Sequence, residues 1–252
     1  MKKIFILILS FVAFNFVYAQ KAKKEPKPKK EKTVKTDFPK KVVTPHPSDH
    51  LLIQFGSDSW TNKSDSIKTN GGKHFNFYLM TDKPFKTNPR FSVAYGLGIG
   101  VSNIYFDKTY VDIKSNSNRL PFSNRSNTDH FAKFKLTEIF LELPVEVRYT
   151  IDPENSNKSW KFAVGAKVGT LMKAYTKGKD LQDKNGNSVY GPGYIEKEFS
   201  KKFFTGTRLS VTGRVGYGNL SLSGAYTITP VISAGFGPEM NTLSLGITIS
   251  GL

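Results

Sequence analysis

The sequence contains no cysteine and only four histidines among its 252 residues. The lack of cysteine excludes disulfides, thiolate metal sites, thiol nucleophiles and a lipidated cysteine anchor. Long runs rich in Ala, Leu and Glu, which are typical of helical domains, are also missing. Aromatic residues instead make up 13% of the chain, and glycine is frequent. This composition favours an all-β protein.

Long apolar runs are scarce as well, and the clearest one lies at the very start of the chain. Two lysines precede fourteen residues, 4–17, that are mostly apolar and end just before Tyr18-Ala19. A membrane-spanning helix needs about 20 apolar residues, so a membrane anchor is the weaker alternative. The pattern predicts a signal peptide over residues 1–19 and therefore an exported protein.

The formal net charge of +17 is unevenly distributed along the chain. Residues 20–48 hold ten lysines, three acidic residues and five prolines. Such a segment buries too little apolar surface to order itself, so we expect a disordered basic tail. Because the chain is exported, nucleic acid is not an expected partner. An anionic polymer of the cell envelope or an envelope protein is the expected partner of residues 20–47, and a solvated spacer is the alternative.

From residue 49 to 252 the sequence alternates between large apolar and small or polar residues. In residues 91–102, Phe, Val, Tyr, Leu and Ile occupy one face of the predicted strand, and Ser, Ala and Gly occupy the other. Small residues suit the crowded interior of a narrow barrel, and large apolar residues suit lipid. Eight segments of this kind predict an antiparallel up-and-down transmembrane β-barrel, with strands of about 10 residues and outer-membrane lipid around it.

The connections between these segments alternate in length. Those at 82–90, 150–159 and 218–219 are short, whereas 107–132 and 177–206 are long; 57–73 is intermediate and 233–241 is short. Outer-membrane barrels have short periplasmic turns and long outer loops, so we expect both termini in the periplasm. Four aromatic residues then fall at the periplasmic strand ends with lipid-facing parity. We interpret them as an interfacial girdle rather than ordinary barrel aromatics: Phe91, Tyr149, Trp160 and Tyr217.

A resemblance to a known family rests on one hairpin. Its first strand is Leu136-Thr-Glu-Ile-Phe-Leu-Glu-Leu-Pro-Val-Glu-Val-Arg-Tyr149, and after a polar turn its second is Phe162-Ala-Val-Gly-Ala-Lys-Val-Gly-Thr-Leu171. This hairpin resembles the central hairpin of the PorT-like outer-membrane barrels of Bacteroidetes. The resemblance implies an outer-membrane barrel, in a family of which one branch serves type IX secretion and gliding. It also implies that the Leu-Pro pair belongs to the barrel wall.

Catalytic constellations are sparse. A barrel hydrolase needs a histidine with a serine and a carboxylate in reach, typically on the strand walls. His46 and His50 lie in or beside the tail, His74 precedes the predicted second strand, and His130 lies near the end of a long loop with Asp129. We therefore predict no enzymatic activity, with the pair of Asp129 and His130 as the best remaining candidate.

Cofactor and metal motifs are equally weak. The glycines at 96, 98 and 100 lie inside a predicted strand with no helix after it, unlike a dinucleotide-binding turn. Glu138, Glu142 and Glu146 share one face of a strand, but Arg148 and Lys167 nearby favour ion pairs over a metal. We expect no cofactor.

Charged residues with lumenal parity form the candidate site. They are Glu138, Glu142, Glu146 and Arg148 on one strand, Lys161 and Lys167 on the next, and Arg214 on another. Charges inside a narrow barrel should pair, because unpaired charge loses solvation without compensation. If Tyr149 faces Trp160, Glu142 lies opposite Lys167, and a shift of two residues instead brings Glu146 to Lys161. We predict that this network fills the lumen and fixes the strand register.

These features favour a structural, adhesive or assembly component that binds through its outer loops. A narrow pore is an alternative, although an eight-stranded barrel has an interior just wide enough for its own side chains. A membrane enzyme that acts on lipid is the other alternative, and it requires catalytic groups to converge near His130.

Overall fold

The computed structural model describes residues 50–251. The predicted signal peptide, 1–19, and basic tail, 20–48, lie outside these residues. Within the described part, the helical content is a single 3-10 turn, Ser156–Lys158. None of its helices is long and apolar enough to cross a membrane.

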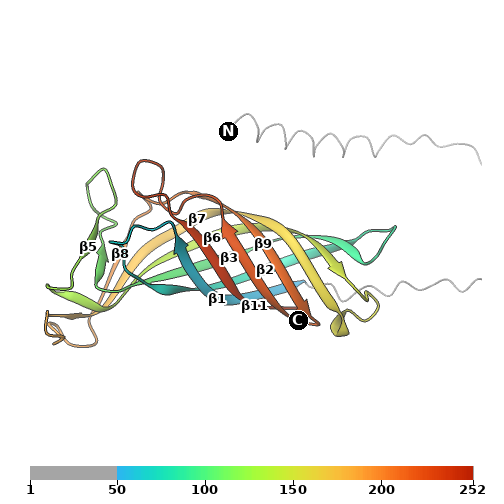
Figure 1. Ribbon diagram of the computed structural model, residues 1–252, viewed down its shortest axis with the longest axis horizontal. Coiled ribbons are helices and arrows are strands. Elements are labelled where there is room, and N and C mark those ends of the chain that lie inside the picture. The colour runs from blue at the N-terminus through green and yellow to red at the C-terminus, as the bar shows by residue number, and fades with distance from the viewer. Residues whose placement is uncertain (1–49, 252) are drawn as a thin grey trace, which may run out of the picture. The chain divides into compact units, whose positions relative to one another are not determined.

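Eight antiparallel strands close into a barrel (Figure 1). Each strand pairs with the next barrel strand along the chain, and the first pairs with the last from Leu52 opposite Ser250 to Thr61 opposite Asn241. The strands are β1 (Leu51–Thr61), β2 (Thr69–Pro84), β3 (Phe91–Phe106), β6 (His130–Thr150), β7 (Trp160–Gln182), β9 (Thr207–Tyr217), β10 (Leu220–Thr227) and β11 (Asn241–Ser250). The predicted all-β antiparallel barrel is confirmed.

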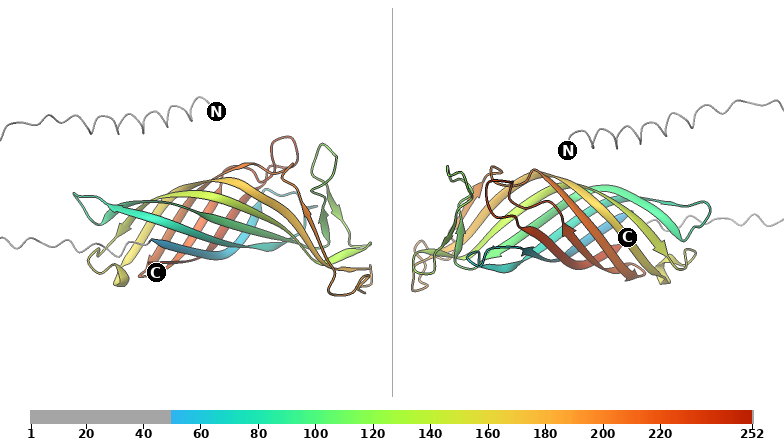
Figure 2. Two further views of the ribbon diagram at one scale, coloured as in Figure 1. Left: turned by 180° about the vertical axis from the view of Figure 1, so that it is seen from behind. Right: turned by 45° about the horizontal axis from the view of Figure 1, so that its top comes forward.

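Three short strands belong to the loops. β4 (Thr109–Val111) pairs with β5 (Phe122–Asn124) as a separate hairpin, and β8 (Ile195–Phe199) extends the sheet beside the far end of β7. Figures 1 and 2 show the longer connections gathered at one end of the barrel, opposite the end that carries the C-terminus. The last of them, 228–240, is longer than predicted because β10 ends at Thr227. We call the two ends the loop end and the turn end.

Four of the barrel strands are much longer than the sequence pattern predicted. β7 has 23 residues, β6 has 21, and β2 and β3 have 16 each. The pairing of β6 with β7 shifts between Ile139 and Phe140, where Met172 is an extra residue on β7. Beyond this bulge both strands continue into a second zone. There, lysines alternate with other residues, which is unlike the apolar alternation of a lipid-facing strand.

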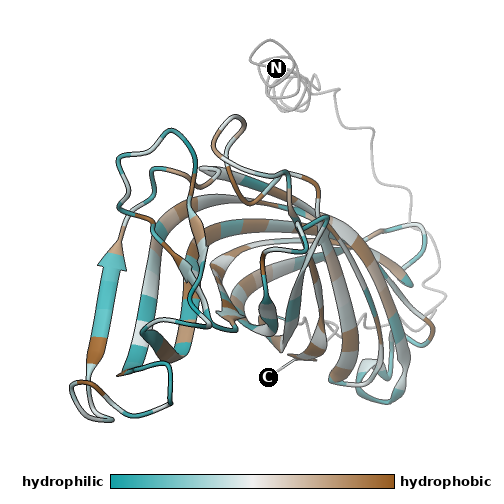
Figure 3. Ribbon diagram, turned by 60° about the vertical axis from the view of Figure 1, so that its left-hand side comes forward, coloured by the Kyte–Doolittle hydropathy of each residue, from teal (hydrophilic) through white to brown (hydrophobic). Residues whose placement is uncertain are grey.

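In the zone between the bulge and the turn end, the outward-facing side chains are mostly apolar and the inward-facing ones mostly small or polar, apart from a small buried cluster of Leu52, Tyr78, Met80 and Ala94. Leu79, Leu97, Leu143 and Val164 are each at least half exposed, whereas their strand neighbours are buried or half-buried. Figure 3 shows the hydrophobic residues as brown segments along the barrel strands, with teal more frequent in the loops. A surface of this composition is stable in lipid rather than in water.

Candidate functional site

Glu142 of β6 is the centre of the charged lumen. It is fully buried, accepts a hydrogen bond from the Tyr78 hydroxyl at 2.5 Å, and lies 3.3 Å from Lys167 Nζ. Arg208 of β9 donates from Nε at 3.1 Å and also from Nη2 to the same carboxylate. Gly100 leaves the space for this group, since a Cβ there would meet Glu142 Oε2 at 2.6 Å. One carboxylate is thus held by two cations and a tyrosine hydroxyl, which come from three other strands, β2, β7 and β9.

Glu146 forms a second cluster nearer the turn end. Its Oε2 atom accepts from Arg148 Nε at 3.0 Å and from Arg214 Nη2 at 3.1 Å. Arg148 also lies 3.9 Å from an Asp82 carboxylate oxygen. Lys161, which is buried, lines a hollow of about 470 Å³ together with Asp82, Arg148 and Arg214. Buried carboxylates in both clusters are therefore paired with cations, as the loss of solvation requires.

The strand register differs from the prediction. Tyr149 faces Phe162 rather than Trp160, so Glu142 lies opposite Gly169 and Lys167 lies opposite Pro144. Glu142 and Lys167 still meet, but diagonally across the two strands, which long side chains allow. The alternative pairing of Glu146 with Lys161 is not formed by the register either, because Glu146 lies opposite Gly165.

Two further corrections concern individual residues. Glu138 is buried on the strand face of Glu142 and interacts electrostatically with Arg208, without a hydrogen bond or a close ion pair to a residue of the described part. Arg208, by contrast, was absent from the predicted network. In the structure it makes the closest contacts with the Glu142 carboxylate. Its lumenal parity with Ser210 and Arg214 was a signal that could have identified it.

A third polar cluster surrounds Asp58 of β1. Its carboxylate lies 2.8 Å from His74 Nδ1 and accepts hydrogen bonds from Ser244 at 2.6 Å and from Ser102. His74 lies inside β2 and His130 begins β6, so the prediction that no histidine lies in a strand was wrong. Both β2 and β6 begin several residues earlier than the apolar alternation suggested.

The Asp58 cluster contains the residue types of a hydrolase triad but not its geometry. Both serines donate to Asp58 and neither is bonded to the histidine, whereas a nucleophilic serine must reach the other ring nitrogen. His74 Nε2 faces Gly246 instead, where a Cβ would lie 3.0 Å away. Within residues 50–251 no group of three or more acidic or histidine side chains is arranged to hold a metal ion. This cluster joins β1, β2, β3 and β11 by hydrogen bonds.

The loop end is closed by an apolar cluster inside the barrel mouth. Strand residues such as Phe106 and Phe134 contribute to it from the wall. The loops contribute a larger set of buried side chains, which we call the loop cap: Ile67, Ile113, Leu120, Phe203, Phe204, Val231, Ile232 and Met240. A bridge between Phe204 and Ile232 ties two of the loops together. The outer loops are therefore packed against one another and against the barrel.

Comparison with known families agrees with this architecture. The sequence-family model of the outer membrane protein β-barrel domain matches residues 53–233 of this chain. The chain belongs to this family. An outer-membrane barrel is expected to be lipid-facing on its outer surface, as the exposed apolar zone requires. No curated protein sequence matches the chain.

Two solved barrels are similar to this outer-membrane barrel at low identity. Neisserial surface protein A (NspA) has 14% identity and a TM-score of 0.29, covering 79% of this chain and 96% of that one. Ail, the attachment invasion locus protein of Yersinia pestis, solved in complex with the heparin analogue sucrose octasulfate, has 12% identity and a TM-score of 0.29, covering 79% and 95%.

The four predicted girdle residues lie at the turn end of the outer-membrane barrel. Phe91 is paired with Tyr149, with ring centroids 4.8 Å apart, and Trp160 is paired with Tyr217 at 5.8 Å. All four are outside the lumen and at least partly exposed. The structure thus gathers all four at one end of the barrel, and their role as an interfacial girdle stays a prediction.

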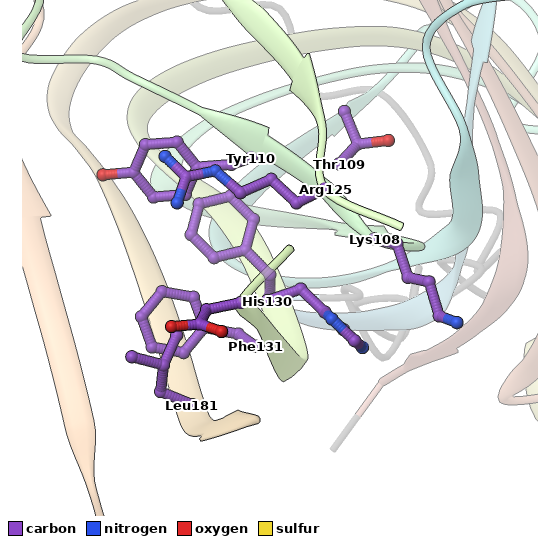
Figure 4. Close-up of a pocket in the computed structure, with 9 residues that line it drawn as sticks. Lys108, Thr109, Tyr110, Arg125, His130, Phe131 and Leu181 are labelled. Carbon is purple, nitrogen blue, oxygen red and sulfur yellow. The ribbon is translucent and has the colours of Figure 1, made fainter. Parts of the chain in front are cut away.

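The candidate histidine at the start of β6, His130, lines a hollow of about 270 Å³ at the rim of the loop end (Figure 4). Its Nδ1 atom lies 3.0 Å from the Thr128 carbonyl oxygen. The Arg125 guanidinium lies over the Tyr110 ring at 4.7 Å, and the Tyr110 hydroxyl donates to Glu198 at 3.0 Å. Burial and this bond to a carboxylate raise the pKa of Tyr110. No serine lines the hollow, so it lacks the nucleophile of a serine hydrolase.

Proposed function

We propose that the protein is a closed outer-membrane barrel with a structural and adhesive role, which it performs through an ordered platform of outer loops. The observation that carries this proposal is that the lumen is filled at two levels. Glu142 and Glu146 hold charged side chains across its middle, and the loop cap fills its mouth. A barrel of eight strands leaves little further space.

The loops suit binding because they are ordered while remaining exposed. Tyr190 in the loop before β8 is 68% exposed, and its ring is tilted against that of Tyr194 with the centroids 5.0 Å apart. Aromatic residues held in this way provide large contact area at a small entropic cost. The loop cap lowers the same cost in the loops that contribute its residues, because those loops are ordered before a partner binds.

We place both termini in the periplasm and the loops outside the cell, on the basis of the short turns and long loops at opposite ends. Residues 20–47 then extend into the periplasm, where ten lysines in the tail favour an anionic envelope polymer or an envelope protein as partner. Protease added to intact cells should spare the tail, and protease admitted to the periplasm should remove it.

A narrower assignment to the PorT-like barrels of Bacteroidetes is supported by the hairpin of β6 and β7, with Pro144 inside the barrel wall. A part in type IX secretion or gliding follows from that assignment. Deleting the gene and measuring secretion of type IX cargo and surface motility tests it; unchanged secretion and motility would contradict it.

The proposed function is tested by adhesion and conductance together. Cells that display the wild-type barrel are compared with cells whose barrel has residues 112–121 and 184–193 replaced by short Gly-Ser turns. We expect adhesion to surfaces and to other cells to fall in the trimmed variant, while its heat-dependent gel shift shows an intact barrel. Equal adhesion, or large steady currents from the wild-type protein in planar bilayers, would contradict the proposal.

A further inference from the structure

Beyond the bulge, the outer surface of β6, β7 and β8 carries a group of lysines that neither the charged lumen nor the loop cap uses. Lys135, Lys177 and Lys197 are directly paired across the three adjacent strands, and Lys133 is directly paired with Lys179. We call these five residues the lysine face. Four of them, with Tyr105 and Phe134, line a hollow of about 380 Å³.

This arrangement is unfavourable for the isolated protein. Directly opposite side chains in a sheet have Cβ atoms only about 5 Å apart, and like charges there are destabilising. No ion pair joins the lysine face to a carboxylate of residues 50–251. Glu196 and Glu198 alternate with Lys197 on β8 and instead accept hydrogen bonds from Tyr194 and Tyr110. The amine of Lys135 donates a hydrogen bond to the neutral Asn103 Oδ1 at 2.7 Å, and none of the five amines lies within ion-pair distance of a carboxylate of the described residues.

The height of the lysine face above the membrane follows from strand geometry. On β6 the lipid-facing row runs from Tyr149 to Ile139, a rise of ten residues. At about 3.3 Å per residue and a tilt of about 40°, this row is about 25 Å tall, which matches the apolar band of outer-membrane barrels. Lys135 follows four residues later, about 10 Å higher, and a flexible lysine stem can reach back towards the headgroups.

The lysine face occupies one side of the barrel only. β6 and β7 extend past the start of β9, whose first residue, Thr207, lies opposite Thr170 before the bulge. Another exposed lysine at this end of the barrel, Lys73 of β2, is not paired with a second lysine. The lysine face differs because its members are paired directly across adjacent strands, which places several positive charges within reach of one polyanionic group.

We propose that the lysine face binds the phosphate groups of a phosphorylated glycolipid in the outer leaflet. The proposal rests on the loop end being outside the cell, as placed under the proposed function. A soluble polyanion would be attracted by the same five lysines. The lipid is favoured because the lysines continue the lipid-facing row of the same strands at headgroup height, with Tyr105 beside the Lys135 amine at 5.8 Å.

The test uses the mature full-length chain in phospholipid nanodiscs, with bisphosphorylated lipid A as the probe and dephosphorylated lipid A as the comparison. The variant Lys135→Gln/Lys177→Gln/Lys197→Gln should bind the phosphorylated probe about 100-fold more weakly at low ionic strength, since each basic residue near a membrane surface contributes about fivefold. A matched control, Lys83→Gln/Lys86→Gln/Lys158→Gln, removes the same charge from exposed positions at the turn end. We expect its binding to change about twofold or less.

A retained heat-dependent gel shift shows that each variant still forms the barrel. Equal binding of the phosphorylated and dephosphorylated probes would overturn the proposal, as would equal losses in the variant and the control. Tighter binding of soluble heparin than of phosphorylated lipid A would also overturn it, in favour of a soluble polyanion. Nanodiscs expose both faces to lipid, so these results do not depend on the topology, which protease treatment of intact cells tests separately.

Discussion

The membrane zone and the loop end of this barrel have opposite polarity on the same strands. On β6, Glu142 points inward and Leu141 outward in the membrane zone. Nearer the loop end of the same strand, Phe134 is buried inside and Lys135 lies on the outer surface. The changeover coincides with the bulge at Ile139.

The difference reflects the surroundings of the two zones. Lipid solvates apolar side chains well, so the membrane zone gains nothing by hiding them and can fill its narrow lumen with paired charges. Water surrounds the loop end, where burying apolar groups stabilises the fold. The loop end is thus built like a soluble β-barrel with an apolar core, continuous with a membrane barrel. Substitutions in the two zones should therefore have different consequences.

The largest effect is expected in the lumen. Glu142→Gln removes the charge that Lys167 and Arg208 share, and leaving buried cations uncompensated should lower the free energy of unfolding by about 3–5 kcal/mol. Urea unfolding in detergent measures it. Arg208→Met in the same chain should recover more of the loss than Lys167→Met, because Arg208 makes the closer contacts. Glu239→Gln, at an exposed position, is the control; equal losses in both glutamate variants would contradict the network.

The next effect concerns the loop cap. Phe203→Ala deletes a fully buried aromatic side chain, which should cost about 3 kcal/mol of local stability. Because the cap residues lie outside the eight paired barrel strands, the loops should become sensitive to protease while the heat-dependent gel shift is unchanged. Hydrogen exchange of residues 107–129 and 183–206 gives the local measure. Protection that equals the wild type would show that the cap does not order these loops.

A smaller effect should separate the two outer surfaces. Leu143 lies near the middle of the lipid-facing row, so Leu143→Lys should cost about 2 kcal/mol of folding into a bilayer. Ile195→Lys, on the exposed outer surface of β8, should change stability by less than about 0.5 kcal/mol. Folding titrations into lipid vesicles compare them. Similar costs at both positions would mean that β8 also lies in lipid.

The smallest effect is a local dependence on pH in the loop that follows β7. Hydrogen bonds from the backbone and side chain of Asn187 hold the pKa of Asp183 below its usual range. A lowered pKa in the folded state means that the ionised form stabilises the turn; this contribution is present above the unfolded pKa and is lost as pH falls through the folded value. Hydrogen exchange of residues 183–188 should therefore quicken in acid. Asp183→Asn should abolish that dependence, and a variant that retained it would identify another group as its cause.

Several features of the barrel were predictable from local patterns alone. Alternation in segments such as 91–102 determined the strands and their lipid-facing sides, because each side chain direction follows from its position in the strand. The same parity placed Glu142, Glu146 and Arg214 in the lumen. The long and short connections indicated which end carries the loops.

Pairing partners depended on the tertiary structure. A shift of two residues between β6 and β7 preserves every side chain's face, so the alternation could not distinguish Trp160 from Phe162 as the partner of Tyr149. His74 was missed because its strand begins at Thr69, before the apolar alternation becomes clear. Its ring fits only because the barrel brings Gly56 and Gly246 against it.

The sequence by itself determined that the chain forms a membrane barrel with a charged lumen, since lipid selects outward apolar residues on every strand. Only the tertiary structure decided which charges meet, how the loops such as 228–240 close the mouth, and that five lysines align across β6, β7 and β8. The physical reason is that parity is a property of one strand, whereas register and loop packing depend on strands and loops distant in the chain.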